Sequence, residues 1–151
     1  MTTLAIFRLF KFVREATGQN HGLRVNAIQK WGGGEDGQSW CCWLVTMVLD
    51  LFFQGQSPVP RLGACEDVRQ ICIKNGWQVA RADVQPGDLA LAVKDGHAHH
   101  IAMVTVPSPL ELIAGNTSSD GHSANGDGCY EHVNTIAESE LEFYRVPGVT
   151  A

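Results

Sequence analysis

One segment, residues 40–53, constrains the fold of this chain more than any other, because almost every residue in it is apolar. It reads Trp-Cys-Cys-Trp-Leu-Val-Thr-Met-Val-Leu-Asp-Leu-Phe-Phe, and its only polar residues, Thr46 and Asp50, are four apart on one helical face. Fourteen residues is long for a buried strand, so the segment predicts a helix that is buried on nearly all sides. Ser39 is a candidate N-cap, which puts the two adjacent cysteines in the first turn of this helix.

The rest of the chain predicts further helices first and an antiparallel sheet second. We expect helices over residues 3–16, 22–30 and 61–75, and a glycine-rich loop over 31–37. The expected strands are 89–93, 100–106, 111–114, 129–133 and 142–146, with a polar loop over 115–128. This order is typical of an α+β fold, and the length fits a single domain, residues 1–151.

Composition and charge exclude several classes of function. The net charge is −5, with 11 basic and 16 acidic residues, which argues against a nucleic-acid partner. No apolar run approaches the ~18 residues that a membrane span needs, so we expect no membrane partner. The apolar N-terminal segment is interrupted by Arg8, Lys11 and Arg14 and lacks a cleavage signal, so we expect a protein made in the cytoplasm without a signal peptide.

The cysteines and histidines suggest a catalytic centre. Five cysteines cannot all pair within the chain, which indicates reduced thiols. A thiol in the first turn of a helix meets the positive end of the helix dipole, so we expect Cys41 to have a lowered pKa and to act as a nucleophile. His100, at the start of a strand, is the expected base, and Asn116 is a candidate to orient its imidazole.

Strand alternation favours His100 over its neighbour His99 as the base. The prediction assumes that Ile101 and Met103 pack on the core, while His100 and the even-numbered residues after it, Ala102 and Val104, face the helix that carries Cys41.

Four motifs, in the same order along the chain, resemble those of CHAP domains, the cysteine, histidine-dependent amidohydrolase/peptidases of bacterial cell-wall enzymes in the papain-like superfamily. They are Gln38-Ser39-Trp40-Cys41-Cys42-Trp43-Leu44-Val45, Pro86-Gly87-Asp88-Leu89, His100-Ile101-Ala102-Met103-Val104 and Ile113-Ala114-Gly115-Asn116-Thr117. The stretch Asn20-His21-Gly22-Leu23-Arg24-Val25 also looks like the lead-in of phage-type members, so the resemblance covers about residues 15–130.

The resemblance implies a papain-like fold, with the nucleophile at the N-terminus of a buried helix that packs on a small antiparallel sheet. It also implies a peptidoglycan hydrolase, either an N-acetylmuramoyl-L-alanine amidase or a stem-peptide or cross-bridge endopeptidase. Its centre would be Cys41, His100 and Asn116, with a thioacyl intermediate and no cofactor or metal. The residues expected to contact substrate are Trp31, Gln38, Trp40 and His99.

The sequence departs from the family pattern at two positions. Ala114 stands where the family often has a glutamate that supports the histidine, and Cys42 stands where a small residue usually follows the nucleophile. Adjacent helical residues point about 100° apart, so only one of the two thiols can face His100, and the Trp-Cys match favours Cys41.

Other functions remain open. One is a non-catalytic relative that binds cell wall or an assembly partner. Another is a metal-binding protein that uses His97, His99 and His100, with His122 or Asp120 as further ligands. A hydrolase without a signal peptide would reach the wall through a holin or a secretion system, and a secreted effector would be paired with an immunity protein.

Overall fold

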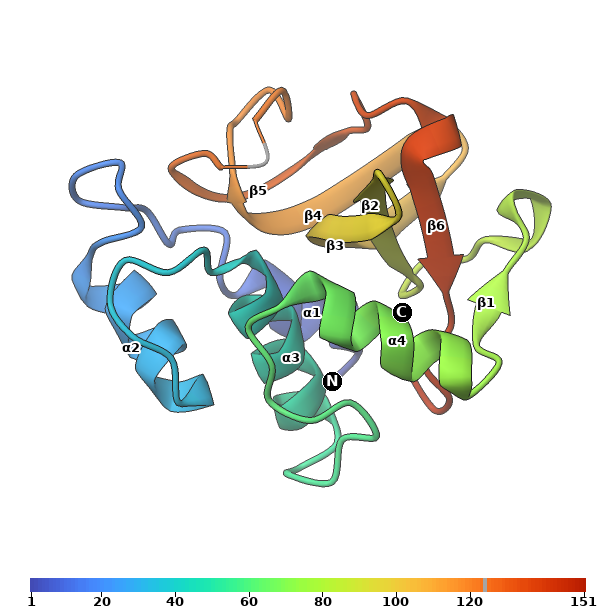
Figure 1. Ribbon diagram of the computed structural model, residues 1–151, viewed down its shortest axis with the longest axis horizontal. Helices are drawn as coiled ribbons and strands as arrows, with labels where there is room; N and C mark the ends of the chain where they lie inside the picture. Colours follow the sequence, from blue (N-terminus) through green and yellow to red (C-terminus); the bar gives the residue numbers. More distant parts are fainter. Residues whose placement is uncertain (124) are drawn as a thin grey trace.

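The described residues form four helices and a six-stranded antiparallel sheet, which confirms the predicted α+β class (Figure 1). The structure is a computed structural model and describes residues 1–123 and 125–151, so Ala124 of the predicted 115–128 loop lies outside the described residues. The helices are α1 (Thr3–Arg8), α2 (Leu23–Gly32), α3 (Cys41–Phe52) and α4 (Cys65–Lys74). The strands are β1 (Gln78–Val79), β2 (Leu89–Lys94), β3 (His97–Pro107), β4 (Leu110–Thr117), β5 (Gly128–Val133) and β6 (Leu141–Tyr144), and two 3-10 turns are η1 (Arg81–Asp83) and η2 (Glu138–Glu140).

The strand order is β1-β6-β2-β3-β4-β5, so the strands that carry His100 and Asn116 are neighbours near the middle of the sheet. In Figure 1, α3 and α4 lie together on one side of this sheet. Among the described residues, no helix combines the length and the apolar character needed to cross a membrane.

Helix α3 confirms the buried helix that its apolar residues predict. The prediction of its N-cap is wrong. The residue at the N-cap is Trp40, not Ser39, and no described side chain caps the first turn. The N-terminal helix ends at Arg8 and not at residue 16, and the predicted loop at 31–37 begins later because α2 continues through Trp31 and Gly32.

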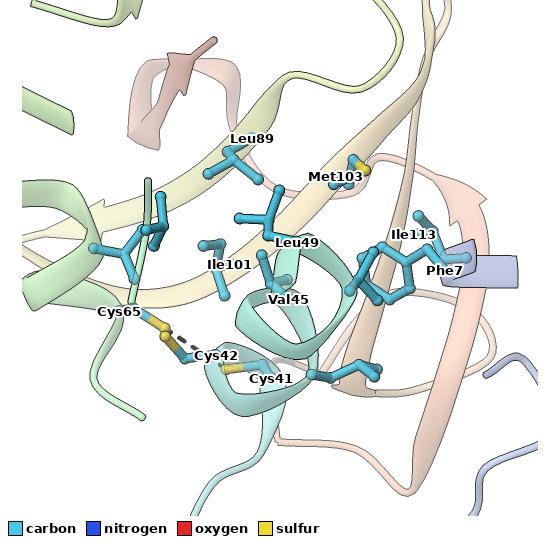
Figure 2. Packing of buried hydrophobic residues seen from close by; sticks show 14 of the residues in the cluster. Phe7, Cys41, Cys42, Val45, Leu49, Cys65, Leu89, Ile101, Met103 and Ile113 are labelled. Carbon is cyan, nitrogen blue, oxygen red and sulfur yellow. Dashed lines mark hydrogen bonds between the residues drawn. The ribbon is translucent and has the colours of Figure 1, made fainter. Parts of the chain in front are cut away.

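The two faces of the sheet carry different side chains. Ile101 and Met103 of β3 pack with Val45 and Leu49 of α3 in a large apolar cluster (Figure 2). The alternate residues of β3 belong to a second, smaller cluster on the opposite face, whose members include Ala102, Val104, Leu112 and Ala114. The prediction that Ala102 and Val104 face the helix is therefore wrong, because the odd-numbered residues take that face.

The start of α3 is pressed against the end of β4. A Cβ atom built on Gly115 would lie 2.7 Å from the ring of Trp40 and 2.8 Å from Leu44. Only a residue without a side chain permits this approach. Gly115 thus fixes where the first turn of α3, and with it Cys41, meets the sheet.

Candidate active site at the start of helix α3

Cys41 is the first residue of α3 and lies in a group of thiols. It is 1% exposed, and its Sγ atom is 3.7 Å from Sγ of Cys65, the first residue of α4, and 3.8 Å from Oγ of Ser39. Figure 2 shows the sulfur atoms of Cys41, Cys42 and Cys65 together beside this end of the helix. All five cysteines are free thiols, as predicted from their odd number.

The pKa of Cys41 is raised, not lowered as the sequence predicts. The hydrogen bond with Cys65 is the largest cause and burial is the second, whereas the imidazole of His100 acts in the opposite direction and lowers the pKa. A helix dipole contributes about 0.3–1 kcal/mol, less than one pKa unit, while full burial can shift a pKa by several units. Burial therefore outweighs the helix terminus in the resting state.

His100 lies in β3 beside a bulge. The register places His100 opposite Ala92 and Ala98 opposite Val93, so His99 is the extra residue. A bulge re-aims the side chains next to it, and bulges are common near active sites. His100 is 4% exposed and acts on the pKa of Cys41, and its Nδ1 atom is buried without a hydrogen-bond partner in the described part of the chain.

Asn116 is held by a polar network under the start of α3. Its backbone has a φ of 55°, a left-handed conformation that asparagine tolerates better than most residues. In the amide orientation that satisfies both ends, Oδ1 accepts from Oγ of Ser39 at 2.8 Å, and Nδ2 donates to Asn20 at 3.0 Å and Glu15 at 3.2 Å. Within residues 1–123 and 125–151 no hydrogen bond joins Asn116 to His100. Its nearest link to the thiol runs through Ser39.

Glu15 and Cys65 are two residues of this centre that sequence reasoning missed. Oε1 of Glu15 accepts a hydrogen bond from the indole of Trp40 at 2.8 Å, and Oε2 accepts one from the backbone N–H of Asn20 at 2.8 Å. Glu15 thus fixes Trp40 beside Cys41 and also contacts Asn116. The contacts of Glu15 with Trp40 and of Cys65 with Cys41 each span 24 or more positions, and no local pattern in the sequence marks such pairs.

Two cavities flank the centre on different sides. One, of about 340 Å³, lies in front of Ser39 and is lined by Gln38, Ser39, Trp43, Gly63 and Ala64. The other, of about 220 Å³, opens on the sheet face that points away from α3, and we call it the imidazole pocket. Its lining includes His99, His100, His122 and His132, the sheet residues Ala102, Leu112 and Ala114, and Thr117, Gly121, Ser123, Thr135, Ile136, Ala137 and Glu140.

The predicted substrate contacts are distributed unevenly. Gln38 lines the cavity at Ser39, and His99 lines the imidazole pocket. Trp40 is completely buried against Gly115, so its side chain has no exposed surface at either cavity. Trp31 lies in a separate apolar groove with Phe10, Phe12 and Met47, which shares no lining residue with the other two cavities.

The histidine cluster proposed as a metal site is not assembled as one. His97 and His99 are exposed on β3, while His100 is buried. Among the described residues, no group of three or more His, Cys, Asp or Glu side chains has the arrangement needed to hold a metal ion.

Comparison with known proteins gives no family for the chain. No protein-family model matches it, and no curated protein matches it.

Proposed function

We propose that this protein is a cysteine hydrolase that cleaves an amide bond of peptidoglycan, with Cys41 as nucleophile and His100 as acid and base. One arrangement carries the proposal: Cys41 is the first residue of α3, α3 packs on β3, and the His100 imidazole of β3 acts to lower the pKa of Cys41. The motifs that resemble CHAP domains supply the substrate class. The buried start of α3 and the antiparallel sheet are consistent with the papain-like arrangement that this resemblance implies.

In the proposed mechanism, substrate binding first favours transfer of the thiol proton of Cys41 to His100. The thiolate attacks the amide carbon, and the imidazolium gives its proton to the leaving amine, which leaves an acyl group on Sγ. Water then attacks the thioester, loses its proton to His100, and releases the acid. The thiol returns when His100 gives back this proton.

The developing oxyanion would be bound at the start of α3. The first backbone N–H groups of a helix have no partner within the helix, and the N–H of Cys41 is one of them. The side chain of Gln38 is the candidate for a second donor, because it lines the cavity in front of Ser39. Its Oε1 atom accepts a hydrogen bond from the backbone N–H of Glu35 at 3.1 Å, so the amide NH₂ is the end of this side chain that would donate to the oxyanion.

Digestion of purified cell wall tests the proposal. The parent protein should release soluble fragments with new amino groups, and mass spectrometry of these fragments names the bond. Cys41→Ser should lose at least about 10³-fold in rate, because it removes the attacking atom. Cys129→Ser, at a buried cysteine of β5, is the matched control and should keep its activity; Cys42→Ser should do the same. Undiminished digestion by Cys41→Ser would falsify the proposal.

A second candidate, a non-catalytic wall-binding protein, is favoured by the raised pKa of Cys41 and by its almost complete burial. The rate of alkylation by iodoacetamide distinguishes the two functions. A hydrolase should show Cys41 reacting faster in the presence of cell-wall fragments, whereas a binding protein should show all five thiols equally slow under both conditions.

Delivery and partners follow from the proposed function. A hydrolase made in the cytoplasm would reach the wall through a holin or a secretion system. If it is a secreted effector, an immunity protein that covers the centre would protect the producing cell. Co-purification with the product of a neighbouring gene, and its inhibition of wall digestion, tests this partner.

A further inference from the structure

Two of the five free thiols are in contact where helices α3 and α4 begin. Cys41 is the first residue of α3 and Cys65 is the first of α4, and their Sγ atoms are 3.7 Å apart, a contact that Figure 2 shows. The two residues are 24 positions apart in the sequence, so the tertiary fold brings them together. The candidate nucleophile therefore has a second thiol beside it.

This contact is close to the geometry that a disulfide needs. The sulfur atoms of a disulfide are about 2.0 Å apart, so from 3.7 Å they would approach each other by about 1.7 Å. A cysteine has one rotatable bond between Cα and the sulfur, and a change of its rotamer moves Sγ by more than this distance. Rotation of the two side chains is therefore enough to bring the sulfur atoms together.

The other three cysteines are less well placed for a disulfide. Cys42 follows Cys41 in α3, and adjacent helical residues point about 100° apart, so these two side chains diverge. A hydrogen bond with Cys65 makes Cys42 the rival partner. Cys72 and Cys129 are buried too, but neither makes a thiol–thiol hydrogen bond with any residue that the structure describes.

A cavity brings small molecules next to the pair. Ser39 and Ala64 line the cavity of about 340 Å³ in front of the start of α3. Oγ of Ser39 is 3.8 Å from Sγ of Cys41, and Ala64 directly precedes Cys65. Cys65 is 6% exposed against 1% for Cys41, so Cys65 is the thiol that a small oxidant meets first. Hydrogen peroxide is little larger than water and fits such a cavity.

From this geometry we propose that Cys41 and Cys65 form a reversible disulfide when the protein meets hydrogen peroxide. The bond occupies the sulfur atom that would attack the substrate, so oxidation switches the hydrolase off and a thiol reductant switches it on. This effect on activity rests on the proposed function, whereas formation of the bond does not.

The reaction balances with one molecule of peroxide. The thiolate of Cys65 attacks one oxygen atom and the O–O bond breaks, which leaves a sulfenic acid on Cys65 and releases hydroxide. The thiolate of Cys41 then attacks this sulfur, the S–O bond breaks, and the disulfide forms as a second hydroxide leaves. Each hydroxide takes up the proton that one thiol has released. The two thiols thus lose two electrons and two protons, and the peroxide becomes two molecules of water.

The raised pKa of each thiol makes the reaction slow at neutral pH. The hydrogen bond with Cys65 and burial raise the pKa of Cys41. The hydrogen bond with Cys41 lowers the pKa of Cys65, but the contact with Cys42 and burial outweigh it, so this pKa is raised as well. Because the thiolate is the attacking species, each pH unit below these pKa values should raise the rate of the first step about tenfold.

Mass spectrometry of the oxidised protein tests for this bond. The reduced parent protein is treated with hydrogen peroxide at mildly alkaline pH, the remaining thiols are blocked with iodoacetamide in urea, and the chain is cut with trypsin. Cleavage after lysine and arginine places the start of α3 in peptide 31–61 and Cys65 in peptide 62–69. Most of the oxidised monomer should contain these two peptides joined, and dithiothreitol should separate them. Oxidised protein in which they are not joined overturns the proposal.

Variants and fragmentation identify the partner of Cys65. Cys42→Ser should form the cross-link at the rate of the parent, and Cys72→Ser is the matched control in α4 and should do the same. Cys41→Ser removes the thiol in contact, so cross-linking should be at least about tenfold slower. Fragmentation of the joined peptides from the parent locates the bond without any variant. A bond at Cys42, or cross-linking of Cys41→Ser as fast as that of Cys42→Ser, overturns the proposal.

Digestion of cell wall measures the effect on function, and its outcomes separate the two proposals. The rate should fall in proportion to the fraction of cross-linked protein, and dithiothreitol should restore it. A cross-link in a protein that never digests cell wall supports the thiol pair and contradicts the hydrolase. Digestion by the reduced protein without any cross-link after oxidation overturns the thiol pair alone. Cross-linked protein that digests as fast as reduced protein overturns the switch.

Discussion

The two faces of the sheet differ in how completely they are covered. On the face that packs on α3, Leu49, Ile101 and Met103 are fully buried and large, and their cluster includes residues from all four helices. On the other face Ala102 and Ala114 give little bulk, and a cavity remains beside them. The difference indicates that the first face carries most of the packing of the core, while the second leaves a cavity beside the candidate base.

Two adjacent residues of β5 show the same contrast within a single strand. Glu131 accepts hydrogen bonds from Arg8 at 2.7 Å and from Lys11 at 3.1 Å. His132, next to it, points to the other face and keeps a buried nitrogen without a partner among the described residues. The charged groups near α1 are satisfied within the fold, while the polar atoms of the imidazole pocket are not.

The largest expected effect compares a leucine on each face. Leu49→Ala should lower the free energy of unfolding by about 3–5 kcal/mol, because it leaves a closed cavity among tightly packed residues. Leu112→Ala should cost only about 2–3 kcal/mol, because its side chain borders the imidazole pocket and has fewer neighbours to lose. Urea denaturation measures both values. A cost for Leu112→Ala that equals or exceeds that of Leu49→Ala would contradict the contrast between the faces.

The next effect concerns the contact that presses α3 on β4. Gly115→Ala should lower the free energy of unfolding by about 1–3 kcal/mol, because its Cβ atom would meet Trp40 at 2.7 Å and force the ring to move. Trp40→Phe removes part of that ring, so the double variant should be more stable than the sum of the two single changes predicts. Strict additivity in denaturation experiments would show that the contact with Trp40 is not the cause.

A third prediction addresses the thiol group at the start of α3. Cys65→Ala removes the hydrogen bond that is the largest cause of the raised pKa of Cys41, so this pKa should fall. Each unit of that fall gives about ten times more thiolate at neutral pH, and alkylation of Cys41 should accelerate in proportion. The pH dependence of alkylation, followed by mass spectrometry, measures the change. Cys72→Ala, in the same helix, is the control and should leave the profile of Cys41 as it is.

The sequence predicts the parts of this fold that depend on local patterns. The apolar run of α3, and the β-rich segments bounded by turns, appear at the expected places because burial and alternation decide them. The predicted helix over residues 3–16 gives way after Arg8 to turns in which N–H groups bond to the carbonyl oxygen three residues earlier, and from Val13 the chain pairs with β5. Arg14 forms a bridge with Gly128, and the carbonyl oxygen of Val13 accepts from the N–H of Cys129 at 3.1 Å.

In the candidate site, too, the sequence predicts the features that depend on local patterns and misses those that depend on tertiary packing. A thiol in a helical first turn and a histidine on a strand are local features, so Cys41 and His100 could be selected from the sequence. The raised pKa of Cys41 could not be foreseen, because it depends on Cys65, which is distant in sequence and adjacent only after α3 and α4 pack. The predicted face of Ala102 was also wrong, because α3 packs on the core face of the sheet, with Ile101 and Met103, and not on the face of the even-numbered residues.

The smallest expected effect concerns the ion pairs that Glu131 of β5 forms with Arg8 and Lys11, and it depends on pH. Hydrogen bonds from Arg8, with a smaller contribution from Lys11, lower the pKa of Glu131 to about 2, so the ionised carboxylate stabilises the folded state. This contribution should be complete above the ordinary pKa of 4.5 and should disappear as the pH falls towards 2. Because Arg8 and Lys11 are about half exposed, it should be no more than about 1 kcal/mol.

Unfolding of the parent and of Glu131→Gln by urea between pH 2 and 7 measures this contribution. The two proteins should differ at pH 7 and converge near pH 2, and 1 M salt should reduce the difference. Glu111→Gln removes the same charge from the neighbouring strand β4, at the position opposite Val133, and serves as the control. A difference between parent and Glu131→Gln that persists at pH 2 would mean that the ion pairs of Glu131 are not its source.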